Sequence, residues 1–259
     1  MNIPFYKYQG TGNDFIMVDD RTRQFPRENH DLVAQLCHRR LGIGADGLIL
    51  LDNHPSEDFE MIYYNADGHL GSFCGNGGRC VVAFANQLGL IQSQTQFTAA
   101  DGLHSALIQD KQVSLDMNPV TEWKISEDFV FMDTGSPHHV TFVEDVSKVD
   151  VAAEGAVIAH NKHYGHSGTN VNFVSMRNDN HIDVRTFERG VEAETLSCGT
   201  GVTASAIAAF LAHKSSQTQI LVHTRGGLLK VDFKAHKESF SDIVLQGPTK
   251  WVFSGTIEL

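Results

Sequence analysis

Two cysteines, Cys74 and Cys198, each stand directly before a Gly-x-Gly triplet, in the segments FCGNGGRC and SCGTGVTA. Apolar residues at helical spacing follow each triplet, so each cysteine is expected at the start of a buried helix. The first turn of a helix presents unpaired backbone N–H groups and the positive end of the helix dipole. Glycines there let a ligand approach the backbone closely, which makes each helix start a site for a carboxylate or a phosphate.

The same positive field favours the thiolate form of a cysteine, so Cys74 and Cys198 are candidate thiolates. If the two helix starts faced each other, one carboxylate could lie between two thiols. One thiolate could then remove an α-proton while the thiol on the opposite face returned one, which inverts a carbon centre without a cofactor. The same geometry would also allow a disulfide between the two cysteines, as an inactive oxidised form.

The other two cysteines, Cys37 and Cys80, are expected to pack as small apolar side chains. Cys37 lies on an apolar helical face, and Cys80 falls inside the first buried helix, where the second half has Ala204. The C-x5-C spacing has no second short-spaced pair, so no metal site is predicted. The histidine-rich segment HNKHYGH, residues 160–166, lacks a suitably spaced carboxylate or cysteine and is predicted to be a loop.

Other segments match at nearly the same offset as the two cysteines, which indicates an internal repeat. GTGNDFIMVDD pairs with TGSPHHVTFVED, GIGADGLIL with SGTNVNFV, and FTAADGLHSALI with VHTRGGLLKVDF. Four landmarks in one order predict two homologous domains, residues 1–118 and 119–259, with the C-terminal strand able to pack back on the first domain.

The elements that position these residues follow from the apolar periodicity. Residues 111–117 and 181–188 alternate like half-buried strands, while 31–40, 77–88 and 201–213 have helical spacing. His and Arg in the last turn of 31–40 would suit the helix dipole, and Gly89 is expected to be a left-handed C-cap. The predicted fold class is mixed α/β of the α+β type: two pseudo-symmetric domains, each of mostly antiparallel strands wrapped around one central helix.

Polar side chains recur at the matched landmarks, each at the start or end of a predicted strand. They are Asn13, Asn65, Asn170, Glu188 and Arg189. Turn chemistry could explain any one of them, but together with the cysteines they predict a polar pocket. Arg189 could hold a carboxylate through two hydrogen bonds, and Glu188 and His138 are candidates to tune the thiols.

Composition narrows the classes of protein that these residues could serve. The chain has 259 residues, 41% of them hydrophobic, and a net charge of −11, which fits a globular protein and argues against nucleic acid as a partner. The start, MNIPFYKYQG, lacks the apolar run of a signal peptide, and residues 202–212 are too short to span a membrane. Neither a dinucleotide-binding nor a Walker A motif occurs. We expect a cytoplasmic protein with a small-molecule ligand and no cofactor.

At these residues the sequence resembles the diaminopimelate epimerase family. The matching segments, from Gly10 to about Val231, are GTGNDF, RRLGIGADG, YNADG with CGNGGRC, GTNVNF, FERG with ETLSCGTG, and GGLLKV. The resemblance implies a cofactor-independent isomerase that interconverts LL- and meso-diaminopimelate in lysine and peptidoglycan precursor synthesis. It also implies a homodimer of chains with two similar domains, each a strand-rich barrel around a central helix.

Carried onto this chain, the resemblance assigns Cys74 as proton donor and Cys198 as acceptor in the LL-to-meso direction, assisted by His138 and Glu188. The substrate contacts that it implies are Asn13, Asn65, Gly75, Asn76, Asn170, Glu188, Arg189, Gly199 and Thr200. The chain departs from the family at Ser136, where many members have Asn, and at Gly47, where some have Gln. These departures concern recognition of the distal end of the substrate.

Three other functions remain as alternatives. A proline or hydroxyproline racemase would use the same paired thiols on a different substrate. A thiol hydrolase or transferase would need only one reactive cysteine with His138. The second cysteine with its Gly-x-Gly triplet would have no role in such an enzyme. A non-catalytic protein that binds amino acids would bind diaminopimelate without exchange of its α-proton.

Overall fold

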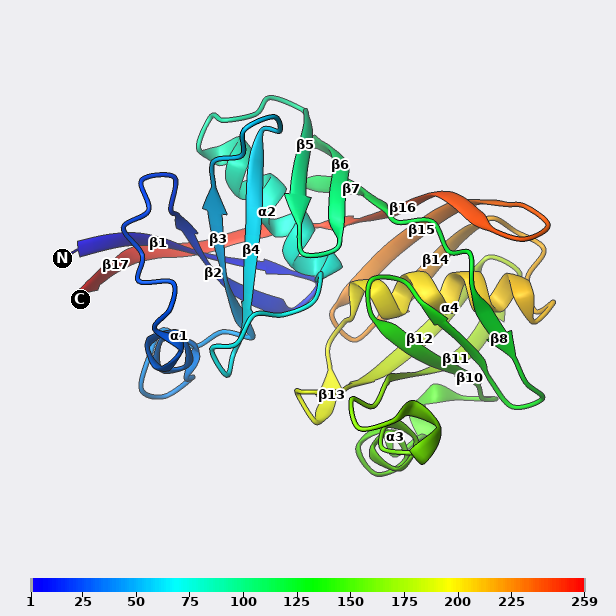
Figure 1. Ribbon diagram of the computed structural model, residues 1–259. Coiled ribbons are helices and arrows are strands. Elements are labelled where there is room, and N and C mark those ends of the chain that lie inside the picture. The colour runs from blue at the N-terminus through cyan, green and yellow to red at the C-terminus, as the bar shows by residue number, and fades with distance from the viewer. Residues whose placement is uncertain (1, 259) are drawn as a thin grey trace. The chain divides into compact units, whose positions relative to one another are not determined.

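The computed structural model describes residues 2–258, which form two compact units. Unit 1 contains residues 2–115 together with 247–258, and unit 2 contains residues 116–246. The chain therefore leaves unit 1 and returns to it for the last strand, β17 (Lys250–Glu258). Figure 1 shows one long helix among the strands of each unit: α2 (Gly75–Gln87) in unit 1 and α4 (Gly199–Leu211) in unit 2.

The strands of unit 1 pair in one continuous order. They are β17 with β1 (Asn2–Gly10), β2 (Asn13–Asp19), β3 (Gly47–Asp52), β4 (Phe59–Asn65), β5 (Gln94–Ala99), β6 (Gly102–Gln109) and β7 (Gln112–Met117). β1 pairs antiparallel with β17 and β2, β2 runs parallel to β3, and β3 runs antiparallel to β4. β4 is parallel to β5, and β5, β6 and β7 are successive antiparallel strands.

Unit 2 repeats this order of parallel and antiparallel pairs. Its strands are β8 (Trp123–Ile125), β9 (Val130–Asp133), β10 (Pro137–Phe142), β11 (Asn170–Asn178), β12 (His181–Glu188), β13 (Ala193–Thr195), β14 (Gln219–Thr224), β15 (Gly227–Ala235) and β16 (Phe240–Pro248). β9 and β10 are antiparallel, β10 is parallel to β11, and β11 is antiparallel to β12. β12 is parallel to β14, and β14, β15 and β16 are antiparallel. The predicted mixed fold with two similar, mostly stranded halves is confirmed.

Each long helix is buried among the strands of its own unit. α2 packs against β1, β2, β3, β4 and β6, and α4 against β9 to β12, β14 and β15. Both helices begin two residues earlier than predicted, because the cysteine before each is the N-cap and has extended backbone angles. Gly89, with φ of 71°, follows α2 in the left-handed conformation, as predicted.

The first helix, α1 (His30–Cys37), is shorter than the predicted helix over residues 31–40. Asn29 caps its start with its side chain, and at His38 the backbone becomes extended and the chain turns back. The predicted basic last turn is therefore wrong. Arg39 leaves the helix and pairs instead with carboxylates near the start of β2 and β3.

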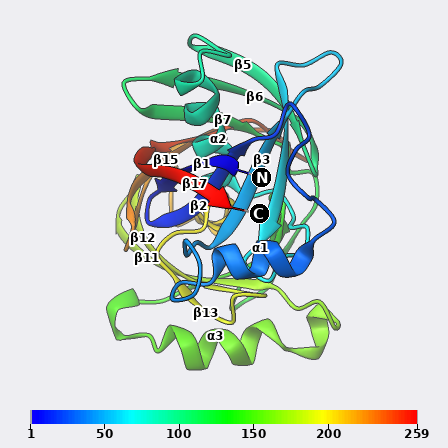
Figure 2. The ribbon, with the colours of Figure 1, turned by 90° about the vertical axis from the view of Figure 1, so that its left-hand side faces the viewer.

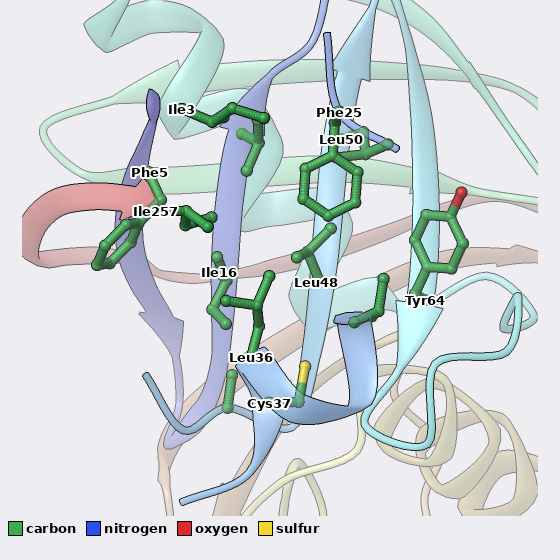
Figure 3. Close-up of a cluster of buried hydrophobic side chains, with 13 residues drawn as sticks. Ile3, Phe5, Ile16, Phe25, Leu36, Cys37, Leu48, Leu50, Tyr64 and Ile257 are labelled. Carbon is green, nitrogen blue, oxygen red and sulfur yellow. The ribbon is translucent and has the colours of Figure 1, made fainter. Parts of the chain in front are cut away.

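α1 covers an apolar cluster on the strands of unit 1, in which Leu36 and Cys37 are buried (Figure 3). Other members of the cluster are Ile3, Phe5, Ile16, Leu48, Leu50 and Ile257. In unit 2, α3 (Val151–Ala159) packs in the same way against β11 and β12, on the outside of the strands (Figure 2). Both predicted packing cysteines, Cys37 and Cys80, are buried.

Candidate functional site

Asn13 is positioned by a tight hairpin between β1 and β2. Thr11 and Gly12 both have positive φ, 50° and 87°, which is the geometry of a two-residue turn between β1 and β2. The Asn13 amide donates from Nδ2 to Asp46 Oδ2 at 2.7 Å. Its other end is therefore the carbonyl oxygen, which accepts hydrogen bonds from Cys74 Sγ at 3.6 Å and from Asn76 Nδ2 at 3.2 Å.

The sulfur of Cys74 has a donor and an acceptor at hand within unit 1. The Gly77 N–H of the first turn of α2 donates to Sγ at 3.4 Å, which stabilises a thiolate. The Asn13 oxygen can instead accept the S–H proton, which stabilises the thiol. Because both protonation states have a partner, this cysteine is suited to take up and to return a proton.

An ionic network holds Asn13 in place. Asp46 accepts from Asn13, and Arg39 bridges Asp46 and Asp14 with contacts of 2.5 and 2.7 Å. Burial alone would raise the pKa of Asp14, but hydrogen bonds from Arg39 and Lys7 lower it to about 2. Burial and the neighbouring Asp14 raise the pKa of Asp46. Arg39 makes these contacts from a position beyond the end of α1.

In unit 2, His138 reaches Cys198 through the hydroxyl of Thr200. His138 Nε2 lies 2.8 Å from Thr200 Oγ1, and that oxygen lies 3.4 Å from Cys198 Sγ. His138 is fully buried, and burial, with a smaller effect from the positive charge of Arg189, lowers its pKa to about 3. Its ring is therefore neutral at physiological pH and acts by orienting Thr200 rather than by carrying a charge.

Asn172 determines which nitrogen of His138 carries the proton. The Thr186 hydroxyl donates to Asn172 Oδ1 at 2.9 Å, and Asn172 Nδ2 donates to the His139 carbonyl at 3.2 Å. The amide orientation is thus fixed, and Nδ2 also donates to His138 Nδ1 at 3.1 Å. His138 must carry its proton on Nε2 and donate it to Thr200, whose own hydrogen can then be given to a Cys198 thiolate.

The helix start of α4 leaves no space for a side chain at Gly201. A Cβ there would lie 2.3 Å from Asn172 Oδ1 and 3.1 Å from His138 Cε1. The second glycine of the SCGTG motif is therefore required by the polar pair packed beneath it. At the equivalent Gly77 of α2, a Cβ would meet the ends of two flexible apolar side chains, at 2.9 and 3.2 Å.

The remaining predicted residues of unit 2 gather at the ends of β11 and β12. Asn170 pairs with His138 in the register of β10 and β11, and its Oδ1 accepts the Arg189 backbone N–H at 3.0 Å. Arg189 donates from Nη1 to the Ser167 carbonyl at 3.1 Å. Glu188 accepts from the Thr195 hydroxyl at 2.5 Å. In unit 1, Asn65 is exposed at the end of β4, where its backbone closes a turn.

Three residues outside the predicted set contact members of it: Asp46 contacts Asn13, Arg79 contacts Asn76, and Asn172 contacts His138. Asn172 stands two residues after Asn170, on the same face of one strand, and Arg79 is a charge inside an apolar helix. Each of these two features in the sequence indicates a polar contact inside the unit. The departure at Gly47 has a steric reason, since a Cβ there would lie 2.5 Å from both the Tyr63 ring and the Tyr64 carbonyl oxygen.

Across residues 2–258, no group of three or more His, Cys, Asp or Glu side chains is arranged to hold a metal ion. The histidine-rich segment 160–166 contains a single turn of 3-10 helix, Lys162–Tyr164. Within the same described range, every helix is too short or too polar to cross a bilayer.

Solved structures identify the class of fold. The chain matches a PhzF-family phenazine biosynthesis protein of Bacillus anthracis with a TM-score of 0.77 at 13% identity, over 100% of both chains. A hydroxyproline epimerase of Agrobacterium vitis, with bound trans-4-OH-L-proline, matches with a TM-score of 0.75 at 15% identity, over 100% of this chain and 93% of that one. At such identities the likeness establishes the fold alone.

Sequence comparison identifies the family. The model of the diaminopimelate epimerase family matches residues 5–123 and 130–252. Diaminopimelate epimerases of Flavobacterium psychrophilum and Chlorobaculum tepidum are 51% and 41% identical, over 97% and 96% of this chain and 99% of each relative. The chain belongs to the diaminopimelate epimerase family, which confirms the resemblance carried by its motifs.

Proposed function

We propose that this protein is a cofactor-independent diaminopimelate epimerase that inverts one α-carbon by a two-thiol mechanism. In the LL-to-meso direction, the Cys198 thiolate removes the α-proton and becomes a thiol. The Cys74 thiol then donates its proton to the opposite face of the carbanion and becomes a thiolate. One C–H bond breaks and one forms, so the substrate keeps its composition and the two sulfurs exchange protonation states.

One observation carries this proposal: in a chain of this family, each of the two matched helices starts with a cysteine as its N-cap. The first-turn N–H groups, with Gly75 and Asn76 on α2 and Gly199 and Thr200 on α4, would bind the α-carboxylate. Their dipoles would stabilise negative charge that develops on the carboxylate as the α-proton leaves.

The polar residues of both units supply the remaining contacts in this proposal. Asn13 and Asn65 in unit 1, and Asn170, Glu188 and Arg189 in unit 2, would bind the amino and carboxylate groups of diaminopimelate. His138 acts as a positioning residue, since its contact with Thr200 aims the hydroxyl at Cys198. The polar set favours a substrate with a charged distal end over proline or hydroxyproline.

Deuterium exchange tests the activity and separates the alternatives. Incubated with LL-diaminopimelate in D₂O, the protein should form the meso isomer with deuterium at the inverted α-carbon. L-proline and hydroxyproline, run in parallel, should gain no deuterium. Binding of diaminopimelate without exchange would point to a non-catalytic binding protein, and exchange of proline alone would point to a racemase. An acyl-thioester burst would favour the thiol hydrolase.

We further propose that the protein is a cytoplasmic homodimer and that residues 1–118 and 119–259 are homologous domains, with the C-terminal strand of the second packed back on the first. Three consecutive apolar residues of β17, namely Trp251, Val252 and Phe253, are 49, 50 and 44% exposed, an apolar edge that a second copy could cover. Sedimentation equilibrium should give twice the 28.5 kDa chain mass, and Trp251→Glu should give the monomer. A monomeric wild type would refute the dimer.

A further inference from the structure

Arg79 on α2 is a fully buried cation without a carboxylate partner. Its side chain has no measurable exposure, and none of the ion pairs within residues 2–258 includes it. Its hydrogen bonds go to neutral oxygens: the Gly75 carbonyl at 3.3 Å, Thr11 Oγ1 at 3.2 Å and Asn76 Oδ1 at 2.9 Å. Its Nε has no hydrogen-bond partner in that part of the chain. Burying an unpaired guanidinium costs folding free energy, so its presence here indicates a role for the positive charge.

The hydrogen bonds of Arg79 lead to Cys74. Because a guanidinium only donates, the Asn76 atom that faces it must be the amide oxygen. The Asn76 amide nitrogen then points to Asn13 Oδ1, at 3.2 Å, the same oxygen that faces Cys74 Sγ. The positive charge thus lies in the first turns of the helix that Cys74 caps, where it adds to the helix dipole.

The other charged side chains around α2 compensate one another rather than Arg79. On the strands packed against α2, every aspartate has a cationic partner. The ion pairs are Lys7 and Arg39 with Asp14 (both 2.7 Å), Arg21 with Asp19 (2.7 Å), and Arg27 and Arg23 with Asp52 (2.8 and 3.2 Å). His104 pairs with Asp101 at 2.8 Å. The remaining titratable groups on those strands are Glu60, Tyr6, Tyr8, Tyr63 and Tyr64. Burial raises the pKa of Cys80 to about 12, so that neighbour stays a neutral thiol.

Burial lowers the pKa of Arg79 to about 10, which leaves the guanidinium charged at neutral pH. The equivalent position on α4, 124 residues later, is Thr203, which also donates to a first-turn carbonyl, that of Gly199, at 3.1 Å. The two helix starts therefore share the backbone contact and differ by one buried positive charge.

We propose that Arg79 is a positioning residue that fixes the Asn76 amide and supplies a buried positive charge to stabilise the Cys74 thiolate. In the two-thiol mechanism this thiolate forms each time Cys74 gives its proton to the carbanion. The catalytic consequence rests on the function proposed above, whereas the effect on the thiol does not require a substrate.

Site-resolved alkylation tests this proposal without a substrate. The rate of iodoacetamide labelling at each cysteine is followed from about pH 6 to pH 10 by peptide mass spectrometry, because only the thiolate reacts. In Arg79→Met and Arg79→Gln, the titration of Cys74 should move to higher pH, with a roughly three- to tenfold smaller thiolate fraction at neutral pH. Arg79→Lys, which keeps the charge, should stay close to the wild type.

Cys198 in the same samples is the internal control and should titrate as in the wild type. Thermal unfolding identifies which variants fold, and Gln is included because its amide can keep one hydrogen bond if Met does not fold. An unchanged Cys74 titration in a folded neutral variant, or an equal shift at both cysteines, would overturn the proposal. If Cys74 shifts as expected but no deuterium exchange occurs with diaminopimelate, the proposed function fails and this inference stands.

Discussion

At the scale of single residues, the two cysteines differ in what surrounds their sulfur atoms. Cys74 has an amide oxygen at 3.6 Å and a helix N–H at 3.4 Å, whereas Cys198 has the Thr200 hydroxyl at 3.4 Å. The amide oxygen accepts and stabilises the Cys74 thiol, and the helix N–H donates and stabilises its thiolate. The Thr200 hydroxyl can accept from a Cys198 thiol or donate to its thiolate. Each cysteine therefore has a partner for both of its protonation states, as the proposed exchange of a proton requires.

The buried His138 should make the protein less stable in acid. Its pKa falls from an ordinary 6.5 to about 3 in the folded state, so below pH 6.5 the unfolded chain binds a proton that the folded chain does not. Stability is therefore lost as the pH falls from 6.5 towards 3, by about 2 kcal/mol at pH 5. Urea unfolding between pH 7.5 and pH 5 should show a shallower pH dependence in His138→Gln, and equal slopes would contradict the assignment.

Removing Asn172 should impair turnover more than binding. In Asn172→Ala, His138 can place its proton on either nitrogen, so Thr200 is no longer held as a donor to Cys198. We expect kcat to fall roughly 10- to 100-fold, the effect of losing an outer hydrogen bond that fixes a histidine tautomer, with a smaller change in KM. Asn178→Ala, on the exposed end of the same strand, is the control and should leave kcat unchanged. A fall in kcat in both variants would argue against the specific role.

At the scale of elements, the two long helices are packed on different kinds of surface. The start of α4 rests on His138 and Asn172, which are both fully buried and polar. The start of α2 meets side-chain ends of Ile49 and Met61 at Gly77. The same substitution at Gly77 and at Gly201 therefore compares a clash with apolar side chains and a clash with a buried polar pair.

Gly201→Ala should be more damaging than Gly77→Ala. The new methyl group in α4 would lie 2.3 Å from Asn172 Oδ1, so Asn172 would have to move and its contact with His138 would be disturbed. At Gly77 the neighbouring atoms are the ends of flexible apolar side chains, which can move aside. We expect a loss of about 1–3 kcal/mol for Gly201→Ala and a smaller loss for Gly77→Ala in chemical denaturation. Equal losses would show that the polar pair does not limit the packing.

Much of the element pattern could be predicted because it is local. The Gly-x-Gly triplets and the apolar spacing after them predict α2 and α4, and alternation predicts β12. The end of α1 could not be predicted, because Arg39 leaves the helix to reach Asp14, 25 residues earlier in the chain. The same holds for Arg79 and Asn172, whose roles depend on Thr11 and His138 in distant segments that only the fold brings together.

At the scale of the whole molecule, the chain is not divided at a single point. Unit 1 is completed by β17, which pairs with β1 from Asn2 with Glu258 to Gln9 with Lys250. Strands from the two ends of the chain thus lie side by side, and the last residues contribute to the first core. Loss of this strand should therefore affect unit 1, although more than a hundred residues of unit 2 separate the two parts in sequence.

Ile257→Ala tests this arrangement. Ile257 is 5% exposed, pairs with Ile3 and belongs to the cluster under α1. Deleting its buried methyl groups should cost roughly 2–4 kcal/mol of unfolding free energy. Thr256→Ala, at the exposed neighbouring position, should cost less than about 0.5 kcal/mol. Equal effects in thermal denaturation would show that β17 contributes little to the core.

Single alanine variants show whether Cys74 and Cys198 are both required as proton carriers. Wild type, Cys74→Ala and Cys198→Ala are incubated with LL-diaminopimelate in D₂O, and meso product with an α-deuteron is measured by NMR. We expect deuterated meso product with the wild type and none with either folded variant, because inversion needs a donor and an acceptor on opposite faces. Normal turnover by either variant would contradict the two-thiol mechanism.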